Sequence, residues 1–152
     1  MAQATVRVEA LCSGGTAAEI TSGSHRWRID EPPFFGGADT APSPVQALLG
    51  ALAGCVAAAG AWAEKDLGYP PSPFTCTVEG DCSPERFFGD KSSKKRAGFT
   101  AVRVIFDGKA DWTPQQRRLW AEETLQRCPV WDNLKDPTQV EARWKSGAEQ
   151  TL

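Results

Sequence analysis

The sequence predicts an α+β fold that combines antiparallel sheets with a long central buried helix and a second pair of helices, the helices packed on one side of the sheet. Two observations indicate this class. Several short segments alternate between apolar and polar residues, and two longer segments, residues 44–66 and 114–127, begin with helix-start signals. With 152 residues, of which 41% are hydrophobic and 24% are charged, the chain fits a single domain spanning residues 1–152.

Three alternating segments near the N-terminus predict an antiparallel meander. We expect its strands at residues 5–11, near 19–21 and at 25–29. In the third strand, His25, Trp27 and Ile29 share a face that is expected to point to the core, so His25 is interpreted as a packed structural histidine. Arg26 and Arg28 share the opposite face, which is typical of a solvated sheet surface.

The long helix is expected to begin at about Pro44, because proline at the first helical position loses no hydrogen bond. Ser43 and Gln46 form a Ser-x-x-Gln capping box in front of it. No charged residue occurs between Ala47 and Ala63. One face carries apolar residues at helical spacing and is expected to pack on the core: Val45, Leu48, Leu52, Cys55, Ala59 and Trp62.

The other faces of this helix consist almost entirely of alanine and glycine, so it is expected to be buried on most sides. Glycine inside a helix costs roughly 1 kcal/mol relative to alanine, and its repeated use predicts close approach of another backbone. One sheet and one further helix cannot cover such a cylinder, so we infer a symmetric homodimer that covers the remaining face. The Gly50-x-x-x-Gly54 pattern also fits a membrane span, but aromatic belts and a basic flank are missing, so no membrane insertion is expected.

The second half of the chain predicts two more strands, a helix pair and a closing strand. Thr113 and Gln116 form a second capping box, and the helix behind it ends at Cys128, because the residue before a proline is pushed out of helical geometry. A basic loop at residues 90–96 is typical of a solvated loop tip. The other elements are strands at residues 74–78, 98–106 and 140–144 and a helical turn at 130–135.

Composition limits the partners of the protein. The formal net charge of −2 argues against a general nucleic-acid binder, which would carry a strong basic excess. Five cysteines at irregular spacing, with no signal segment at the N-terminus, argue against a secreted disulfide framework and predict a reducing, cytoplasmic location. The sequence has no His-Glu-x-x-His motif and no Walker-type loop, so neither a metal nor a cofactor is expected.

Cysteines are the remaining candidates for chemistry. Cys12, Cys76 and Cys82 lie beside a turn, in a strand and in a loop, form no Cys-x-x-Cys pair, and are interpreted as structural or incidental. Cys55 lies in the middle of the long apolar helix, and Cys128 lies where a helix gives way to Cys-Pro-Val. From residue type alone, two unlinked buried thiols are the simpler interpretation of this pair.

Several segments, taken in order, resemble the OsmC/Ohr superfamily and in particular its OsmC-like branch. The resemblance covers residues from about 25 to 145 and implies an α+β fold and an intertwined homodimer with two active sites at the subunit interface. The segments that carry it are Asp30-Glu-Pro, Gly36-Gly37-x-Asp39, Pro42-Ser-Pro44, the helical stretch of residues 48–55 that ends in Cys55, and Arg127-Cys128-Pro-Val130.

The resemblance further implies an enzyme that reduces organic hydroperoxides. Cys55 would be the peroxidatic thiolate, which becomes a sulfenic acid, and Cys128 would resolve it as a disulfide that an external thiol then reduces. A thiol in the middle of a helix gains little from the helix N-terminus, so an arginine must favour the thiolate. Arg28 is the candidate, because it precedes the Asp-Glu-Pro loop that leads to the helix, and Arg26 is the alternate.

One position departs from the family pattern. Catalytically competent relatives carry a glutamate ten residues before the first cysteine, where it orients the arginine, whereas this chain has Val45 there and the uncharged Gln46 next to it. Two hypotheses follow. The chain is a thiol-dependent hydroperoxide reductase, or it is a non-catalytic protein that binds an apolar or thiol-containing small molecule at the dimer interface, or serves as a weak redox sensor.

Overall fold

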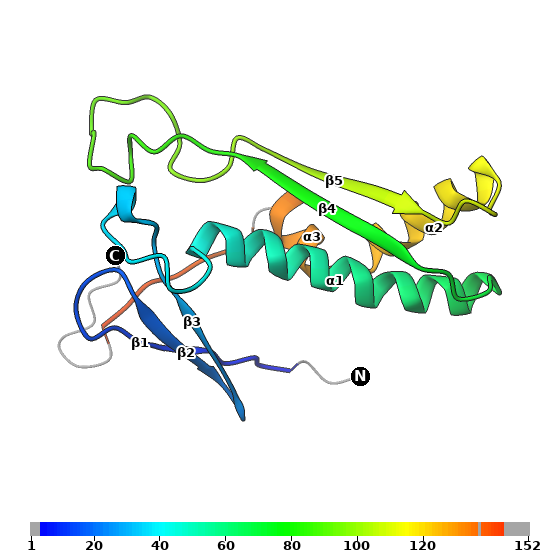
Figure 1. The fold of residues 1–152 in the computed structure, drawn as a ribbon, viewed down its shortest axis with the longest axis horizontal. Coiled ribbons are helices and arrows are strands. Elements are labelled where there is room, and N and C mark those ends of the chain that lie inside the picture. Colours follow the sequence, from blue (N-terminus) through cyan, green and yellow to red (C-terminus); the bar gives the residue numbers. More distant parts are fainter. Residues whose placement is uncertain (1–3, 137, 145–152) are drawn as a thin grey trace. The chain divides into compact units, whose positions relative to one another are not determined.

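The computed structural model describes residues 4–136 and 138–144 and shows the predicted α+β fold class (Figure 1). β1, β2 and β3 form a three-stranded antiparallel sheet in that order, and β4 pairs with β5 in a separate two-stranded sheet. The elements in chain order are β1 (Glu9–Leu11), β2 (Ala18–Ser22), β3 (His25–Ile29), the short 3-10 helix η1 (Pro33–Phe35), α1 (Pro44–Leu67), β4 (Phe74–Asp81), β5 (Ala101–Gly108), α2 (Pro114–Gln126) and α3 (Pro129–Lys135).

By its internal contacts the described chain divides into two compact units. The first unit contains residues 4–53 and 77–105, and the second contains residues 54–76 and 106–144, without residue 137. The boundaries fall inside α1, β4 and β5, so each of these elements contributes residues to both units. The meander belongs to the first unit, and the helix pair α2 and α3 belongs to the second.

The three N-terminal strands form the predicted meander in the first unit. Its register pairs Ser22 with His25 next to the turn and Ala18 with Ile29 at the other end of β3. The predicted core face of β3 is wrong for two of its three residues. Ile29 is buried, whereas His25 is exposed and Trp27 is 43% exposed. Alternation marks the more apolar side of a strand, but it does not show whether the same chain covers that side.

A buried carboxylate organises the loop between β3 and α1. Asp30 accepts hydrogen bonds from the backbone N–H and the hydroxyl of Thr40, at 3.1 and 2.8 Å. The N–H groups of Glu31 and Ala38 also donate to it, at 2.9 and 3.2 Å. These bonds, with those from Thr40 foremost, lower the pKa of Asp30 to about 2. A Cβ on Gly37 would lie 1.8 Å from the Glu31 carbonyl oxygen, so this tightly closed loop requires glycine there.

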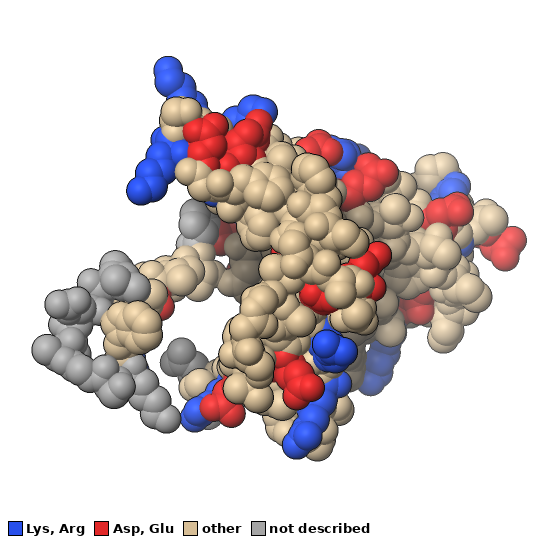
Figure 2. Space-filling model, turned by 60° about the vertical axis from the view of Figure 1, so that its left-hand side comes forward, with Lys and Arg blue, Asp and Glu red and all other residues tan. Residues whose placement is uncertain are grey.

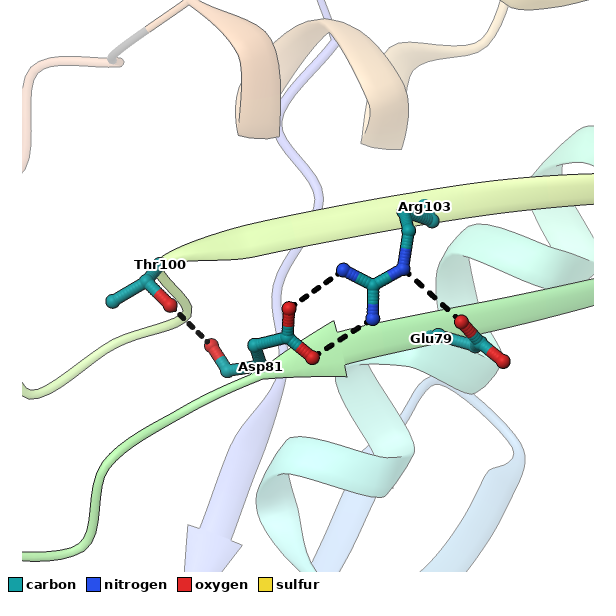
Figure 3. Close-up of polar contacts among 4 residues, drawn as sticks. All are labelled: Glu79, Asp81, Thr100 and Arg103. Carbon is teal, nitrogen blue, oxygen red and sulfur yellow. Dashed lines mark hydrogen bonds and ion pairs between the residues drawn. The ribbon is translucent and has the colours of Figure 1, made fainter.

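An ion-pair network ties β4 to β5 in the first unit (Figure 3). Arg103 donates to both carboxylate oxygens of Asp81, at 2.6 and 2.8 Å, and to Glu79 at 3.1 Å. Thr100 donates its backbone N–H to the Asp81 carbonyl at 2.7 Å, next to the start of β5. The hydrogen bonds from Arg103 lower the pKa of the Asp81 carboxyl group. All three charged side chains are about half exposed, so we assign the network a role in strand register with little contribution to stability.

The surface of the chain carries mixed charge and exposed aromatic rings. On the face seen in Figure 2, acidic and basic side chains are interspersed between broad uncharged areas, as the small net charge suggests.

Four phenylalanines of the first unit lie together, with the rings of Phe35 and Phe88 stacked at 5.2 Å and Phe34 and Phe87 packed edge-on beside them. Phe34 is 76% exposed in the single chain.

The core of the second unit is built on tryptophan. Trp120 of α2 donates its indole N–H to the Gly60 carbonyl of α1 at 3.0 Å and packs edge-on against Phe74 and Phe106. A Cβ on Gly60 would lie 2.8 Å from the Trp120 ring, so the indole fits only because position 60 lacks a side chain. Trp112 completes this core, together with Ala63, Leu67, Tyr69 and Ala121.

A buried ion pair lies within this aromatic core. Lys109 and Glu64 form a salt bridge in which the side chains are 2% and 9% exposed. The Lys109 ammonium group also donates to the Ser72 carbonyl at 2.7 Å, and its nitrogen lies 4.4 and 4.5 Å from the ring centres of Trp112 and Trp120. The lysine is therefore held by a carboxylate, a carbonyl and two aromatic faces. Sequence analysis did not single out either charged residue.

α1 begins and ends where the sequence predicts, and its capping box is present. The Ser43 N–H donates to the Gln46 side chain at 2.9 Å, and the Gln46 N–H donates back to the Ser43 hydroxyl at 3.4 Å. The buried stripe, however, differs from the predicted face. It consists of Leu52, Val56, Ala59 and Ala63, whereas Val45, Leu48 and Trp62 are 40 to 59% exposed. Because the helix is apolar all round, hydrophobicity alone could not identify the side that faces its own chain.

Much of α1 is uncovered within the single chain, which contradicts the expectation that it is buried on most sides. Of its most apolar 18-residue window, 22% is buried. Gly50 and Gly54 have no atom near the position of an added Cβ, and Gly60 is approached by the side chains of Trp120 and Phe74, so the predicted close approach of another backbone is not found at these three glycines. By length and composition the helix could also cross a membrane, a test that core helices of soluble proteins pass as well.

The second helix pair agrees with the sequence, whereas the closing strand does not. Thr113 and Gln116 form the predicted capping box, and α2 ends one residue before Arg127. In place of a strand at residues 140–144, the structure has a single bridge residue, Arg143. Val140 is 86% exposed and Trp144 is 71% exposed, so the alternating apolar side chains of this segment find no surface to pack on in the described chain.

Candidate active site

Cys55 lies in α1 at the start of the second unit. It is partly exposed, next to the fully buried Val56. The helix continues for several turns on both sides of it, so its thiol is remote from the backbone N–H groups that are free at a helix N-terminus. Whatever stabilises a thiolate here must come from neighbouring side chains.

Cys128 occupies the junction between α2 and α3. Its backbone is extended, as the following Pro129 requires, while its N–H donates to the Leu125 carbonyl at 3.3 Å and its carbonyl accepts from Asp132 at 3.0 Å. The side chain is completely buried. The proline thus fixes the cysteine at a sharp change of direction, with both backbone groups hydrogen-bonded.

The structure brings Cys55 and Cys128 into contact. Burial raises the pKa of Cys128 to about 11, and its hydrogen bond to the Cys55 side chain acts in the same direction. The backbone N–H groups of Trp131 and Val130 at the start of α3 act in the opposite direction. Cys128 therefore keeps its proton at neutral pH and can donate it to the Cys55 sulfur.

An ion-pair cluster anchors the end of α2 beside the second cysteine. The guanidinium group of Arg127 donates to Asp66 of α1 at 2.9 Å and to Glu123 at 3.1 Å. These carboxylates raise the pKa of Arg127 further above its ordinary value. The arginine next to Cys128 is thus committed to two carboxylates, and it holds α2 against α1 near the thiol pair.

The two arginines considered for the thiolate lie on β3, in the first unit. Arg28 faces Glu19 of β2 in the sheet register, and Arg26 faces Thr21. Both are exposed, and neither forms an ion pair with any residue in the described ranges. Val45 lies in the first turn of α1 and is 46% exposed.

The other three cysteines, Cys12, Cys76 and Cys82, are also free thiols. Cys12 and Cys82 are exposed. Cys76 of β4 is partly buried, and this burial raises the pKa of its thiol. Within residues 4–136 and 138–144, no three side chains of histidine, cysteine, aspartate or glutamate are grouped so that they could hold a metal ion. Cys55 and Cys128 are therefore the candidate pair for thiol chemistry among the described residues.

Two buried polar residues of the second unit, Glu64 and Thr124, were not predicted from the sequence. Glu64 follows Val56 and Gly60 at intervals of four residues, so it could have been recognised as a charge on the buried side of α1 once that side was known. Thr124 similarly lies four residues after Trp120 and four before Cys128, and all three are buried. The signal in both cases is a polar residue in register with buried neighbours.

A family model and a solved structure, both described as OsmC-like, match this chain. The family model described as OsmC-like protein matches residues 36–143. An OsmC-like protein from Mycoplasma pneumoniae has a similar structure, with a TM-score of 0.74 and 15% identity, over 90% of this chain and 91% of the other. No curated protein sequence matches the chain.

Two solved structures of similar fold carry functional names. An organic hydroperoxide resistance protein OsmC from Legionella pneumophila aligns with a TM-score of 0.64 and 17% identity, over 89% of this chain and 92% of the other. The organic hydroperoxide resistance protein OhrB of Bacillus subtilis aligns with a TM-score of 0.58 and 20% identity, over 88% and 92%. At these identities the structural likeness shows the fold, not the activity.

Proposed function

The chain belongs to the OsmC-like protein family, and from this we propose that it is a thiol-dependent peroxidase that reduces organic hydroperoxides through Cys55 and Cys128. The observation that carries the proposal is the proximity of the two thiols, one partly exposed and the other completely buried. The partly exposed Cys55 suits attack on a peroxide, and the buried Cys128 suits the later resolving step.

In the first step the Cys55 thiolate attacks the terminal oxygen of the hydroperoxide. A sulfur–oxygen bond forms, the oxygen–oxygen bond breaks, and the departing alkoxide takes up a proton to leave as an alcohol. Cys55 becomes a sulfenic acid and has lost two electrons to the peroxide. We assign Arg28 the task of favouring the thiolate, with Arg26 as the alternate.

In the second step Cys128 resolves the sulfenic acid. The Cys128 sulfur attacks the Cys55 sulfur, the sulfur–oxygen bond breaks, and the hydroxide leaves as water together with the proton from Cys128. The resulting disulfide is reduced by two equivalents of an external thiol through thiol–disulfide exchange. The burial of Cys128 shields the resolving thiol from direct oxidation before Cys55 has reacted.

A homodimer is part of this proposal, because α1 presents a broad apolar face that the single chain leaves uncovered. A second copy packed on the alanine and glycine face would give Gly50 and Gly54 the close neighbour that they lack. Sedimentation velocity at micromolar concentration is expected to give about twice the chain mass of 16.4 kDa. A stable species at the mass of one chain would contradict it. We place the protein in the cytoplasm, where thiols stay reduced.

The proposal is tested by mapping disulfides after exposure to an organic hydroperoxide. Reduced protein is treated with one equivalent of cumene hydroperoxide, free thiols are blocked, and peptides are analysed by mass spectrometry. A peptide in which Cys55 is joined to Cys128 is expected, together with loss of the peroxide. Consumption of no peroxide, with both cysteines recovered as free thiols, would remove the proposal.

The second candidate is a non-catalytic protein that binds an apolar or thiol-containing small molecule or senses redox state weakly. Its specific support is Val45, which replaces the carboxylate expected to orient the arginine. In this case a Cys55→Ser variant would bind the same ligand as the wild type, and the disulfide of the preceding experiment would not form.

A further inference from the structure

A buried hydroxyl group in the second unit, that of Thr124, has no hydrogen-bond partner among the described residues. The Thr124 side chain is completely buried, and its Oγ1 atom has no partner among the residues that the structure describes. A buried hydroxyl without a hydrogen-bond partner is unfavourable, so such groups are uncommon unless another state of the protein uses them.

The position of Thr124 follows from the contacts on either side of it. Trp120, four residues earlier, donates to Gly60 of α1, and Cys128, four residues later, contacts Cys55 of α1. Trp120, Thr124 and Cys128 therefore form one buried row that faces α1. Thr124 precedes the resolving cysteine by four residues, about one helical turn along the chain.

The resolving step changes which hydrogen bonds stabilise the Cys128 sulfur. While Cys128 is a neutral thiol, it donates its proton toward Cys55 and requires no further donor. When Cys128 attacks the Cys55 sulfur, its proton departs and negative charge develops on a sulfur from which water is excluded. In a dry environment, a hydrogen bond donated to developing charge is worth more than one to a neutral group.

We propose that Thr124 is a further residue of the resolving step, whose hydroxyl rotates to donate a hydrogen bond to the Cys128 sulfur as that sulfur attacks the oxidised Cys55. The inference rests on the proposed function for its biological setting. The chemistry that it describes, attack of Cys128 on an oxidised form of Cys55, can also be measured without a peroxide.

The first measurement uses an aromatic disulfide, 5,5′-dithiobis(2-nitrobenzoate), on a variant whose other cysteines, Cys12, Cys76 and Cys82, are serine. Cys55 attacks the reagent, forms a mixed disulfide and releases one coloured thiolate. Cys128 then attacks the Cys55 sulfur, forms the protein disulfide and releases a second coloured thiolate. The two releases report the attack by Cys55 and the attack by Cys128 separately.

In Thr124→Val, which keeps the shape but lacks the hydroxyl, the second release is expected to slow about tenfold while the first keeps its rate. Thr124→Ser, which keeps the hydroxyl, should stay within about twofold of the parent in both. An unchanged second release in Thr124→Val, equal slowing in both variants, or no second release from the parent would overturn the inference.

The same variants treated with cumene hydroperoxide separate this inference from the proposed function. Thr124→Val is expected to accumulate Cys55 sulfenic acid, which dimedone traps, because formation of the sulfenic acid is unaffected and only its resolution slows. If the parent protein consumes no hydroperoxide but resolves the mixed disulfide in a Thr124-dependent way, the proposed function fails and the role of Thr124 remains.

Discussion

Cys55→Ser is expected to abolish hydroperoxide reduction, with a loss of at least roughly a thousandfold in the rate of peroxide consumption. A serine hydroxyl does not ionise at neutral pH and cannot form a sulfenic acid, so the first bond of the proposed mechanism cannot be made. The measurement is the consumption of cumene hydroperoxide in the presence of a dithiol reductant.

Two further cysteine variants serve as controls. Cys128→Ser should consume about one equivalent of hydroperoxide per chain in the absence of reductant and hold Cys55 as a sulfenic acid that dimedone labels. Cys82→Ser, which changes an exposed cysteine of the first unit, should match the wild type. Peroxide consumption by Cys55→Ser at the wild-type rate, or its loss in Cys82→Ser, would contradict the assignment of Cys55.

The ends of the helices were predictable from sequence because short-range chemistry decides them. The Ser43 and Thr113 capping boxes form as expected, and α2 ends at Gln126, shortly before Pro129, the first residue of α3. The strand at residues 140–144 was not predictable, since a strand needs a partner and only Arg143 makes a bridge. Local patterns therefore specified where elements begin, while pairing depended on distant parts of the chain.

The candidate site was predictable only in part. The residues alone indicated two unlinked cysteines, Cys55 and Cys128, and only the family resemblance implied that they act as a pair. The structure places them in contact, while their catalytic roles remain proposals. Thr124 and the charged groups of the second unit were missed, because their importance depends on which side of a uniformly apolar helix faces the chain. Val45, Leu48 and Trp62 show the same ambiguity, because they were predicted to face the core and are exposed in the structure.

The buried pair of Lys109 and Glu64 yields the largest expected effect on stability. Glu64→Gln removes the counter-charge of an ammonium group that is 2% exposed and surrounded by aromatic rings, and is expected to lower the free energy of unfolding by about 3–5 kcal/mol. Lys109→Met should cost a similar amount, because it leaves the carboxylate of Glu64 without its partner in the same dry core. Urea unfolding followed by tryptophan fluorescence measures both, since Trp112 and Trp120 contact the lysine.

The double variant shows whether the ion pair itself stabilises the fold, or whether the single variants lose stability because each leaves one buried charge unpaired. Glu64→Leu combined with Lys109→Met removes both charges and fills the core with apolar groups of similar size, so it should recover most of the loss and stay within about 2 kcal/mol of the wild type. Arg118→Ala, which breaks the exposed pair with Glu122, should cost less than about 0.5 kcal/mol. All unfolding curves are compared at one protein concentration, because a dimer makes the midpoint depend on it. If each single variant of the buried pair unfolded within 1 kcal/mol of the wild type, Lys109 and Glu64 would not be the buried, mutually dependent charges described above.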